Sequence, residues 1–224
     1  LIIINAERAN FCSGNPSLME ISDKQRNILV GTGGHAKAIF AELHEQGQFV
    51  VAVVDNHYPE WLARHRGMGQ RPIHFKTDDD GLNFLQGEPD LNIIMGMGGI
   101  TPDQLTRRLG IFMGYLKSRT RSAKPLVFSS ASVSEHVALE EGAVVLHQAI
   151  IQPDVFIGSA AIINTGAIVE HDSRIGRGSH IAPGAVVLGG ATVGDNCLVG
   201  ANATVLPGVT IPDNVLIPAS SVAK

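Results

Sequence analysis

The second half of the chain repeats one hydrophobic pattern every six residues. Each sixth residue is Val, Ile or Leu, and the residue two positions earlier is small or Val. A helix repeats every 3.6 residues and a plain strand every two, so neither gives this pattern. A six-residue period is typical of a parallel β-helix. The aliphatic series is Val133, Leu139, Val145, Ile151, Ile157, Ile163, Val169, Ile175, Ile181, Val187, Val193, Val199, Val205, Ile211 and Ile217.

Each six-residue repeat, or hexad, therefore predicts one short strand and one corner. We expect the aliphatic residue to point into a narrow core and the small residue to lie where the backbone turns. Three hexads would close a triangular coil, so equivalent residues would stack eighteen positions apart in about five coils. The glycines that directly follow an inward aliphatic residue are expected where a tight turn has no room for bulk. They are Gly158, Gly176, Gly194 and Gly200.

Residues 27–56 carry a different pattern, which predicts strand, glycine turn, helix and strand. A buried strand is expected over 28–30, a helix with apolar residues at helical spacing over 35–46, and a second strand over 50–54. Asp55 follows the second strand. This order is Rossmann-like, and its glycine turn, Gly31-Thr32-Gly33-Gly34, is placed to hold phosphate through backbone N–H groups.

A second glycine loop is expected farther along the same domain. Residues 91–95 predict a buried strand, and Gly96-Met97-Gly98-Gly99 would close it at the same sheet edge as the first turn. Thr101 followed by Gln104 predicts a capping box that begins another helix. A domain of about 100 residues suits a mononucleotide or a nucleotide sugar better than a dinucleotide.

Composition also changes near residue 125. Nine of the eleven aromatic residues precede it, and no lysine occurs from 125 to 223. We therefore predict an α/β Rossmann-like domain over 27–124 and an all-β parallel β-helix over 125–224. Residues 1–26 form an extension to which the sequence assigns no role.

Overall charge and cysteine content narrow the function classes. The net charge is −4, which favours neither nucleic acid nor an anionic membrane. The two cysteines, Cys12 and Cys197, form neither a disulfide framework nor a zinc site, and a cytoplasmic location is expected. No apolar run approaches the roughly 20 residues of a membrane span.

Four motifs occur in one order along the chain: GTGGHAK at 31–37, VVDN at 53–56, MGMGG at 95–99 and IINTGAIVEHDSRIGRGSHIAPGA at 162–185. Together with the hexads they resemble the two-domain hexapeptide-repeat nucleotide-sugar acetyltransferases. This group includes the bacillosamine and perosamine N-acetyltransferases and the sialic acid O-acetyltransferases. The resemblance covers about residues 27–220. It implies left-handed coils, acetyl-CoA as co-substrate with no metal, and a homotrimer with active sites between subunits.

The resemblance also implies roles for individual residues. His171 would be the general base and Asp172 would orient it. The nucleotide sugar would contact Gly33, Gly34, His35, Asp55, Asn56 and Gly98. Acetyl-CoA would contact Asn164, His180, Gly189, Ala201 and Ala219.

The sequence departs from the family pattern at several points. Asn56 stands where an acidic residue is common. The segment PLVFSSASVS lacks an Ile-His-Pro often found before the first coil. The sequence given ends at Lys224, ahead of a tail that in the family packs beside coenzyme A, so part of that contact stays unassigned.

The cluster Glu170-His171-Asp172 suits acyl transfer to an amine. A sugar ammonium must lose a proton before it attacks a thioester, and a histidine titrates in the right range to take it. An adjacent carboxylate can fix the imidazole tautomer; Asp172 is our choice and Glu170 the alternative. Backbone N–H groups or His180 are candidates to stabilise the oxyanion. We expect direct transfer, with Cys197 as a buried filler.

The spacing of the two histidines carries a geometric consequence. Nine residues are half of an eighteen-residue coil, so His171 and His180 should lie on different faces of one β-helix. They would then meet more easily across a cleft between two β-helices, which favours an oligomer.

Three other functions compete with this interpretation. A zinc enzyme resembling γ-type carbonic anhydrase needs three protein ligands, and the His171–His180 spacing does not match its two histidines, which are five residues apart. A sialic-acid-type O-acetyltransferase and a non-catalytic nucleotide-binding scaffold are the other two. Nothing in the sequence distinguishes UDP from GDP or dTDP.

Overall fold

A computed structural model describes residues 25–64, 71–88, 90–118 and 123–224 of the 224-residue chain. Almost all of the extension expected over 1–26 lies outside these residues. None of the described helices is long and apolar enough to cross a bilayer.

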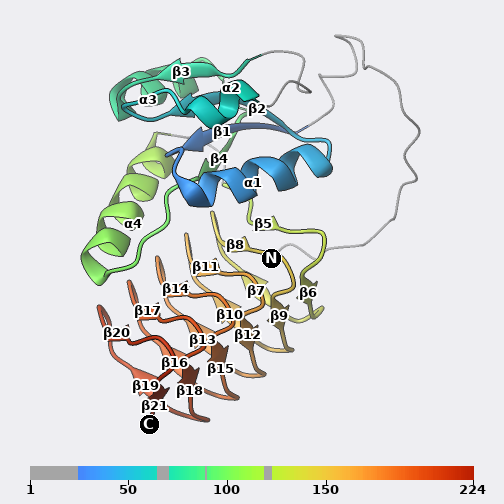
Figure 1. Cartoon of the computed structure of the whole chain (residues 1–224), viewed down its shortest axis with the longest axis vertical. Helices are drawn as coiled ribbons and strands as arrows, with labels where there is room; N and C mark the ends of the chain where they lie inside the picture. Colours follow the sequence, from blue (N-terminus) through green and yellow to red (C-terminus); the bar gives the residue numbers. More distant parts are fainter. Residues whose placement is uncertain (1–24, 65–70, 89, 119–122) are drawn as a thin grey trace.

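The amino-terminal domain is a parallel four-stranded sheet with helices on its two faces (Figure 1). The strand order is β3-β2-β1-β4, and every neighbouring pair is parallel. The elements are β1 (Arg26–Val30), α1 (Gly34–Glu45), β2 (Phe49–Val54), α2 (Glu60–Arg64), β3 (Ile73–Phe75), α3 (Asp78–Gln86), β4 (Asn92–Met95) and α4 (Pro102–Lys117). The Rossmann-like prediction is confirmed for β1, α1, β2, β4 and α4. The sequence did not predict α2, β3 and α3, which are short or carry no clear period.

The two glycine loops open at the same edge of the sheet, as expected. β1 pairs directly with β4, and Val30 lies opposite Met95 at their carboxyl ends. Gly31 has φ +85°, and a Cβ there would collide with the Met97 side chain. A glycine is therefore required where the first loop crosses the second.

Helix α4 begins with side-chain caps close to those expected. The Thr101 hydroxyl accepts a hydrogen bond from the Gln104 N–H at 3.3 Å. The Gln104 carboxamide accepts from the Ile100 N–H at 2.9 Å, one residue before the position that a capping box would use. The bond to Thr101 satisfies an N–H group that the first helical turn leaves free.

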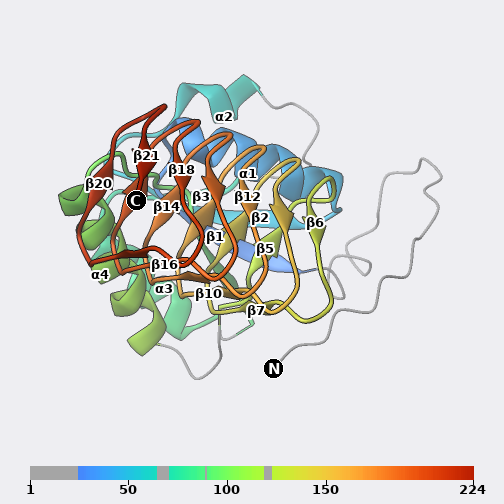
Figure 2. The same ribbon diagram turned by 90° about the horizontal axis from the view of Figure 1, so that it is seen from below.

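The carboxyl-terminal half is a left-handed parallel β-helix of two-residue strands. They are β5 (Leu126–Val127), β6 (Ser132–Val133), β7 (Ala138–Leu139), β8 (Val144–Val145), β9 (Ile150–Ile151), β10 (Phe156–Ile157), β11 (Ile162–Ile163), β12 (Ile168–Val169), β13 (Arg174–Ile175), β14 (His180–Ile181), β15 (Val186–Val187), β16 (Thr192–Val193), β17 (Leu198–Val199), β18 (Thr204–Val205), β19 (Thr210–Ile211), β20 (Leu216–Ile217) and β21 (Val222–Ala223). They form three sheets, ordered β19-β16-β13-β10-β7, β20-β17-β14-β11-β8-β5 and β21-β18-β15-β12-β9-β6. Seen from below, successive coils lie side by side, from β6 at the right to β20 at the left (Figure 2).

The predicted eighteen-residue stacking is confirmed by the strand register. Ile157 pairs with Ile175, and Ile163 pairs with Ile181. The aliphatic series fills a continuous core, fully buried from Val145 to Val205. The small residues two positions earlier also line this core, because each corner brings its side chain inward.

The corners place every sixth residue from Gly142 to Ser220 in the left-handed backbone region, with φ between +54° and +70°. Most of these residues are Gly, Asn or Asp, which tolerate that region best. Gly158, Gly176, Gly194 and Gly200 do not belong to this series. A Cβ at any of them would collide with the backbone of the next coil, so close approach between coils excludes bulk there.

One face of the β-helix, the sheet β20-β17-β14-β11-β8-β5, turns toward the amino-terminal domain. Its outward residues include Leu126, Val144 and Ile162, which are buried with Phe40 and Leu43 of α1 in one cluster. Helix α4 runs down the same side of the coils (Figure 1), and its Leu105 packs with Ala182 and Leu198. Burial of these apolar side chains fixes the domain on this face of its own β-helix.

Candidate active site

Asp55 lies at the end of β2 and is bonded to the first glycine loop. One carboxylate oxygen accepts from both the N–H and the hydroxyl of Thr32 at 2.8 Å, and the other accepts from the His57 N–H at 3.2 Å. Burial alone would raise the pKa of Asp55, but these hydrogen bonds and the nearby His57 ring lower it overall. Asp55 is therefore an ionised acceptor that holds the turn.

Aromatic side chains support the same turn, and the sequence pattern did not indicate them. The Trp61 indole N–H donates to the Thr32 carbonyl at 2.9 Å, and the His74 Nε2 atom lies 2.7 Å from the Asp55 carbonyl. Tyr58 packs edge-on against His74, and its hydroxyl is buried with no partner among the described residues. These residues come from short segments between the predicted strands, where no period marks them.

His35 lies in the first turn of α1, beside the second glycine loop. Gly98 is so close that a Cβ there would lie 3.7 Å from the His35 Cβ, whereas Gly33 and Gly34 face open space. Burial, with the charge of Arg108 and the His180 ring, lowers the pKa of His35 to about 3. Its ring is therefore neutral at physiological pH. The Nε2 atom is buried with no partner among the described residues.

Arg108 of α4 is a buried cation that the sequence analysis did not select. Its Nε–H donates to the Met97 carbonyl at 2.7 Å, and its Nη1–H donates to the Ala160 carbonyl at a β-helix corner. Burial lowers its pKa to about 10, so it remains charged at neutral pH. Arg108 thus joins the second glycine loop to the β-helix. An Arg at helical spacing on an apolar face was the signal that could have revealed it.

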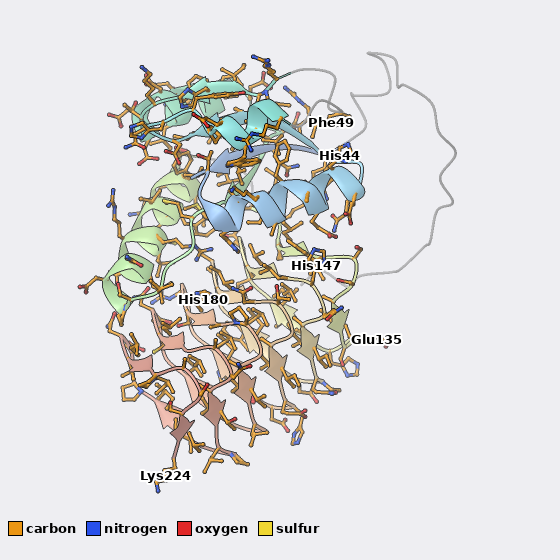
Figure 3. The ribbon with its side chains drawn as sticks, in the orientation of Figure 1. His44, Phe49, Glu135, His147, His180 and Lys224 are labelled. Atoms are coloured by element: carbon orange, nitrogen blue, oxygen red, sulfur yellow. The ribbon has the colours of Figure 1, made fainter. Side chains whose placement is uncertain are left out.

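His180 lies on the face of the β-helix that meets the amino-terminal domain (Figure 3). Its Nδ1 atom is 2.8 Å from the Gly99 carbonyl, and its Nε2 atom is 2.9 Å from the Asn164 side-chain nitrogen. Burial lowers the pKa of His180; the Gly99 bond opposes this shift and the charge of Arg108 adds to it. The chain's own amino-terminal domain covers the apolar face around His180, and the meeting of His180 with His171 across a cleft between two β-helices stays a prediction.

His171 and Asp172 lie at the corner between β12 and β13, on a different face from His180, as expected. The His171 Nδ1 atom is 2.7 Å from the Asp172 carboxylate, and both side chains are about two-thirds exposed, at 63% and 65%. The hydrogen bond to Asp172 raises the pKa of His171; burial lowers it slightly, and the charges of Asp172 and Glu170 raise it further. Asp172, rather than Glu170, holds the ring.

The space beside the other imidazole nitrogen is provided by Gly189, one coil farther on. A Cβ at Gly189 would lie 2.8 Å from His171 Nε2. Because Nδ1 donates to a carboxylate, Nε2 of the neutral ring carries the lone pair. The geometry therefore presents an oriented, solvent-accessible base.

The remaining residues that the resemblance selects lie on another edge of the β-helix. Asn164 follows β11, and Ala201 and Ala219 occupy equivalent corners after β17 and β20, eighteen residues apart. His171 and Gly189 occupy the next edge, after β12 and β15. The residues expected at the acetyl-CoA site therefore lie on two different edges of the β-helix within one chain.

Cys197 is buried, and burial is the main cause that raises its pKa, so its thiol is not activated. Its Sγ lies near the Pro212 and Asp195 carbonyls at a corner, where it fills space as expected. Within the described part of one chain, no group of three or more His, Cys, Asp or Glu side chains is placed to hold a metal ion.

Two family models match the β-helix. Residues 154–189 match the bacterial transferase hexapeptide (six repeats), and residues 190–222 match the hexapeptide repeat of succinyl-transferase. No curated protein sequence matches the chain.

Solved structures match both domains together. Perosamine N-acetyltransferase from Caulobacter crescentus, in complex with CoA and GDP-perosamine, is 30% identical, with a TM-score of 0.74 over 90% of this chain and 89% of that one. A variant of that enzyme with one histidine replaced by alanine gives a TM-score of 0.75 at 30% identity over the same shares. The acetyltransferase domain of PglB from Neisseria gonorrhoeae, with acetyl coenzyme A, is 21% identical, with a TM-score of 0.74 over 90% and 94%; at that identity it supports the fold alone. The chain belongs to the two-domain hexapeptide-repeat acetyltransferases, in which a Rossmann-like domain precedes a left-handed parallel β-helix.

Proposed function

We propose that this protein transfers the acetyl group of acetyl-CoA to the amino group of a nucleotide-linked amino-deoxy sugar. The His171–Asp172 pair carries the proposal: an exposed imidazole is held by a carboxylate through Nδ1 and is open at Nε2. The similarity to an enzyme solved with CoA and GDP-perosamine supports the substrate class.

In the proposed reaction, His171 Nε2 takes a proton from the sugar ammonium or from the amine as it attacks. Asp172 accepts the Nδ1–H and stabilises the imidazolium that forms. The amine nitrogen bonds to the thioester carbonyl carbon, and the CoA thiolate leaves and collects a proton. No covalent enzyme intermediate is needed, which agrees with the buried, unactivated Cys197.

The nucleotide sugar would bind across the two glycine loops. Gly33 and Gly34 present open backbone at the start of α1, where N–H groups and the helix dipole favour phosphate. His35 and Gly98 would meet the diphosphate and sugar, and Asp55 with Asn56 would meet the nucleoside. The ionised carboxylate of Asp55, which Thr32 anchors at the loop, supports this placement.

Acetyl-CoA would lie along the β-helix, and a homotrimer would complete each site. Asn164, Ala201 and Ala219 occupy one edge of the chain, whereas His171 and Gly189 occupy the next. When parallel copies pack side by side, the first edge of one copy can face the second edge of its neighbour. Such a cleft would bring Asn164 and His171 to one thioester and would place Gly189, Ala201 and Ala219 along the coenzyme A arm.

The test is turnover with acetyl-CoA and a panel of 4-amino-4,6-dideoxy nucleotide sugars carrying UDP, GDP or dTDP, followed by release of free thiol. We expect turnover with at least one sugar and a loss of about 10²–10⁴-fold in His171→Ala, the range for general acid–base catalysis. Near-normal turnover in that variant would overturn the assignment of the base. If the protein acetylates a sugar hydroxyl group and none of the sugar amines, the O-acetyltransferase alternative is favoured. Sedimentation of the same preparation tests the trimer.

A further inference from the structure

Arg108 of α4 is a positive charge buried where the amino-terminal domain meets the β-helix. Its side chain is 1% exposed, and burial lowers its pKa only to about 10, so the guanidinium is charged at neutral pH. It donates hydrogen bonds to the backbone carbonyls of Met97 and Ala160. Its Nη2 group is buried with no hydrogen-bond partner in the described part of the chain. Backbone oxygens therefore solvate this cation without neutralising it.

No carboxylate of the described residues compensates this charge. The side-chain ion pairs within residues 25–64, 71–88, 90–118 and 123–224 do not include Arg108. A neighbouring carboxylate would also raise the pKa of Arg108, whereas the shift is downward and is caused by burial. A buried charge without a counter-ion destabilises the folded chain. A ligand that brings negative charge close to Arg108 therefore lowers the free energy of this region.

The charge lies next to both glycine loops. The Arg108 Nε–H reaches the Met97 carbonyl at 2.7 Å, and the Met97 side chain lies so close to Gly31 that a Cβ there would collide with it. His35, in the first turn of α1, is also within the field of Arg108: burial, and after it the charge of Arg108, lowers the pKa of His35 to about 3. Arg108 therefore adds positive potential where the backbone of the first glycine loop faces open space.

The start of α1 favours a ligand of the same charge. Gly33 is its N-cap and provides no side-chain hydrogen bond, and the first turn contains no acidic residue. The N–H groups of this turn and the positive end of the helix dipole are thus left for a ligand. The helix start and the buried guanidinium both favour an anion.

We propose that Arg108 is a binding residue that acts through its charge, holding the diphosphate of the nucleotide sugar on the glycine loops without touching it. This inference rests on the proposed function. The diphosphate carries the negative charge of a nucleotide sugar, whereas the nucleoside alone is neutral. Lys37, a cation in the same turn of α1, is exposed, so dissolved salt screens its charge. The charge of Arg108 is buried, so salt screens it much less.

The first test measures the affinity of UDP, GDP and dTDP by calorimetry, and that of the corresponding neutral nucleosides by competition. The proteins are the wild type, Arg108→Gln and Arg107→Gln. Glutamine keeps N–H donors for the backbone carbonyls but removes the charge. We expect Arg108→Gln to bind the preferred diphosphate at least about tenfold more weakly and its nucleoside less than about twofold more weakly, because only the diphosphate interacts with the charge.

Arg107→Gln is the matched control, because it removes the same charge from an exposed position on the same helix. We expect it to leave both affinities unchanged. Equal weakening of diphosphate and nucleoside in Arg108→Gln would overturn the proposal, since Arg108 would then only maintain the shape of the loop. Equal weakening of the diphosphate in both variants would also overturn it, since net charge alone would explain the effect.

The second test needs only the wild-type protein. We expect inorganic pyrophosphate to compete with the bound nucleoside diphosphate and to raise the Tm, because it carries the charge without the nucleoside. Failure of pyrophosphate to compete would overturn the proposal even if Arg108→Gln did not fold. Failure of the proposed function gives a different result, namely that no nucleoside diphosphate binds the wild type and no nucleotide sugar releases thiol from acetyl-CoA.

Discussion

His171 lies directly against Gly189, the residue eighteen positions later in the chain. A Cβ on Gly189 would lie 2.8 Å from Nε2 and 2.9 Å from Cε1 of the imidazole. The nitrogen that must accept the substrate proton therefore occupies space that only glycine leaves open. The stacking of coils, rather than the local EHD sequence, provides that space.

Gly189→Ala tests this relationship. The imidazole is exposed and can swing away, so we expect little change in stability but a loss of roughly 10²-fold in kcat from a displacement of about 1 Å. Steady-state kinetics and thermal unfolding measure the two effects separately.

Gly190→Asn is the matched control for that substitution. Gly190 has φ +69°, and a Cβ added there would meet no described atom within 4 Å. Asn196 already occupies an equivalent corner at φ +54°. We expect normal kcat in this variant. An equal loss in both variants would mean that the corner, and not contact with His171, determines the rate.

The pH dependence of turnover should follow the raised pKa of His171. A general base works only when deprotonated, so kcat/KM should rise with pH through a midpoint above the ordinary histidine value of about 6.5. Asp172→Asn removes the principal cause of the shift, so the midpoint should move down while the plateau falls by about 10²-fold or more. Asn is compatible with φ +62° at this corner, as at Asn202. If the midpoint is the same in Asp172→Asn as in the wild type, Asp172 does not determine the pKa of the catalytic base.

His35 should make the protein less stable in mild acid. Its pKa is about 3 in the folded state and about 6.5 when unfolded, so the unfolded chain binds the extra proton between these values. Stability is thus fully present above pH 6.5 and decreases as pH falls, by about 2 kcal/mol between pH 7 and pH 5. Urea unfolding at pH 7 and pH 5 measures this decrease in the free energy of unfolding. We expect it to be smaller in His35→Gln than in the wild type by about 2 kcal/mol. His44→Gln, at an exposed position on the same helix, should keep the wild-type pH dependence.

Close approach of the coils predicts that Gly176→Ala is strongly destabilising. Its Cβ would collide with the Gly194 carbonyl group, and backbone cannot move aside as a side chain can. We expect a loss of at least about 1–3 kcal/mol, the usual cost of overpacking. Gly110→Ala in α4 has open space and a helical backbone, so it should instead gain about 0.5–1 kcal/mol. Chemical denaturation of both variants decides the point, and equal stabilities would contradict the role of coil spacing.

The interface between the domains predicts that Glu42→Leu is destabilising. This buried carboxylate of α1 accepts from the Ser129 N–H at 2.5 Å and from Gln46 at 2.7 Å. Leucine would remove the acceptor of both hydrogen bonds, at a cost of about 0.5–1.5 kcal/mol for each. Glu45→Leu on the exposed face of the same helix should change stability little. Calorimetry measures the stability of both variants. Equal stabilities would mean that the hydrogen bond from Ser129 to Glu42 does not stabilise the interface between the domains.

The sequence indicated much of this structure because its signals are local and repeated. Val145, Ile163 and Ile181 had to share one core once the six-residue period was recognised, and the register confirms it. The sequence also indicated that Gly176 has no room for bulk, but it did not indicate which glycines adopt the left-handed backbone, since Gly176 and Gly184 are indistinguishable as letters. Only the backbone shows that Gly176 meets another coil whereas Gly184 has φ +68°.

By itself, the sequence determined the two domains, the eighteen-residue stacking and the pairing of a histidine with a neighbouring carboxylate, because each depends on residues that are close in the chain or repeat at a fixed spacing. Only the tertiary structure decided that Arg108 and His180 join the Gly96–Gly99 loop to the β-helix, and that Asp172 rather than Glu170 holds His171. Those contacts depend on how one domain packs on one face of the other. That packing is set by the combined burial of many apolar side chains, such as Phe40 against Val144 and Ile162, which no local pattern of residues records.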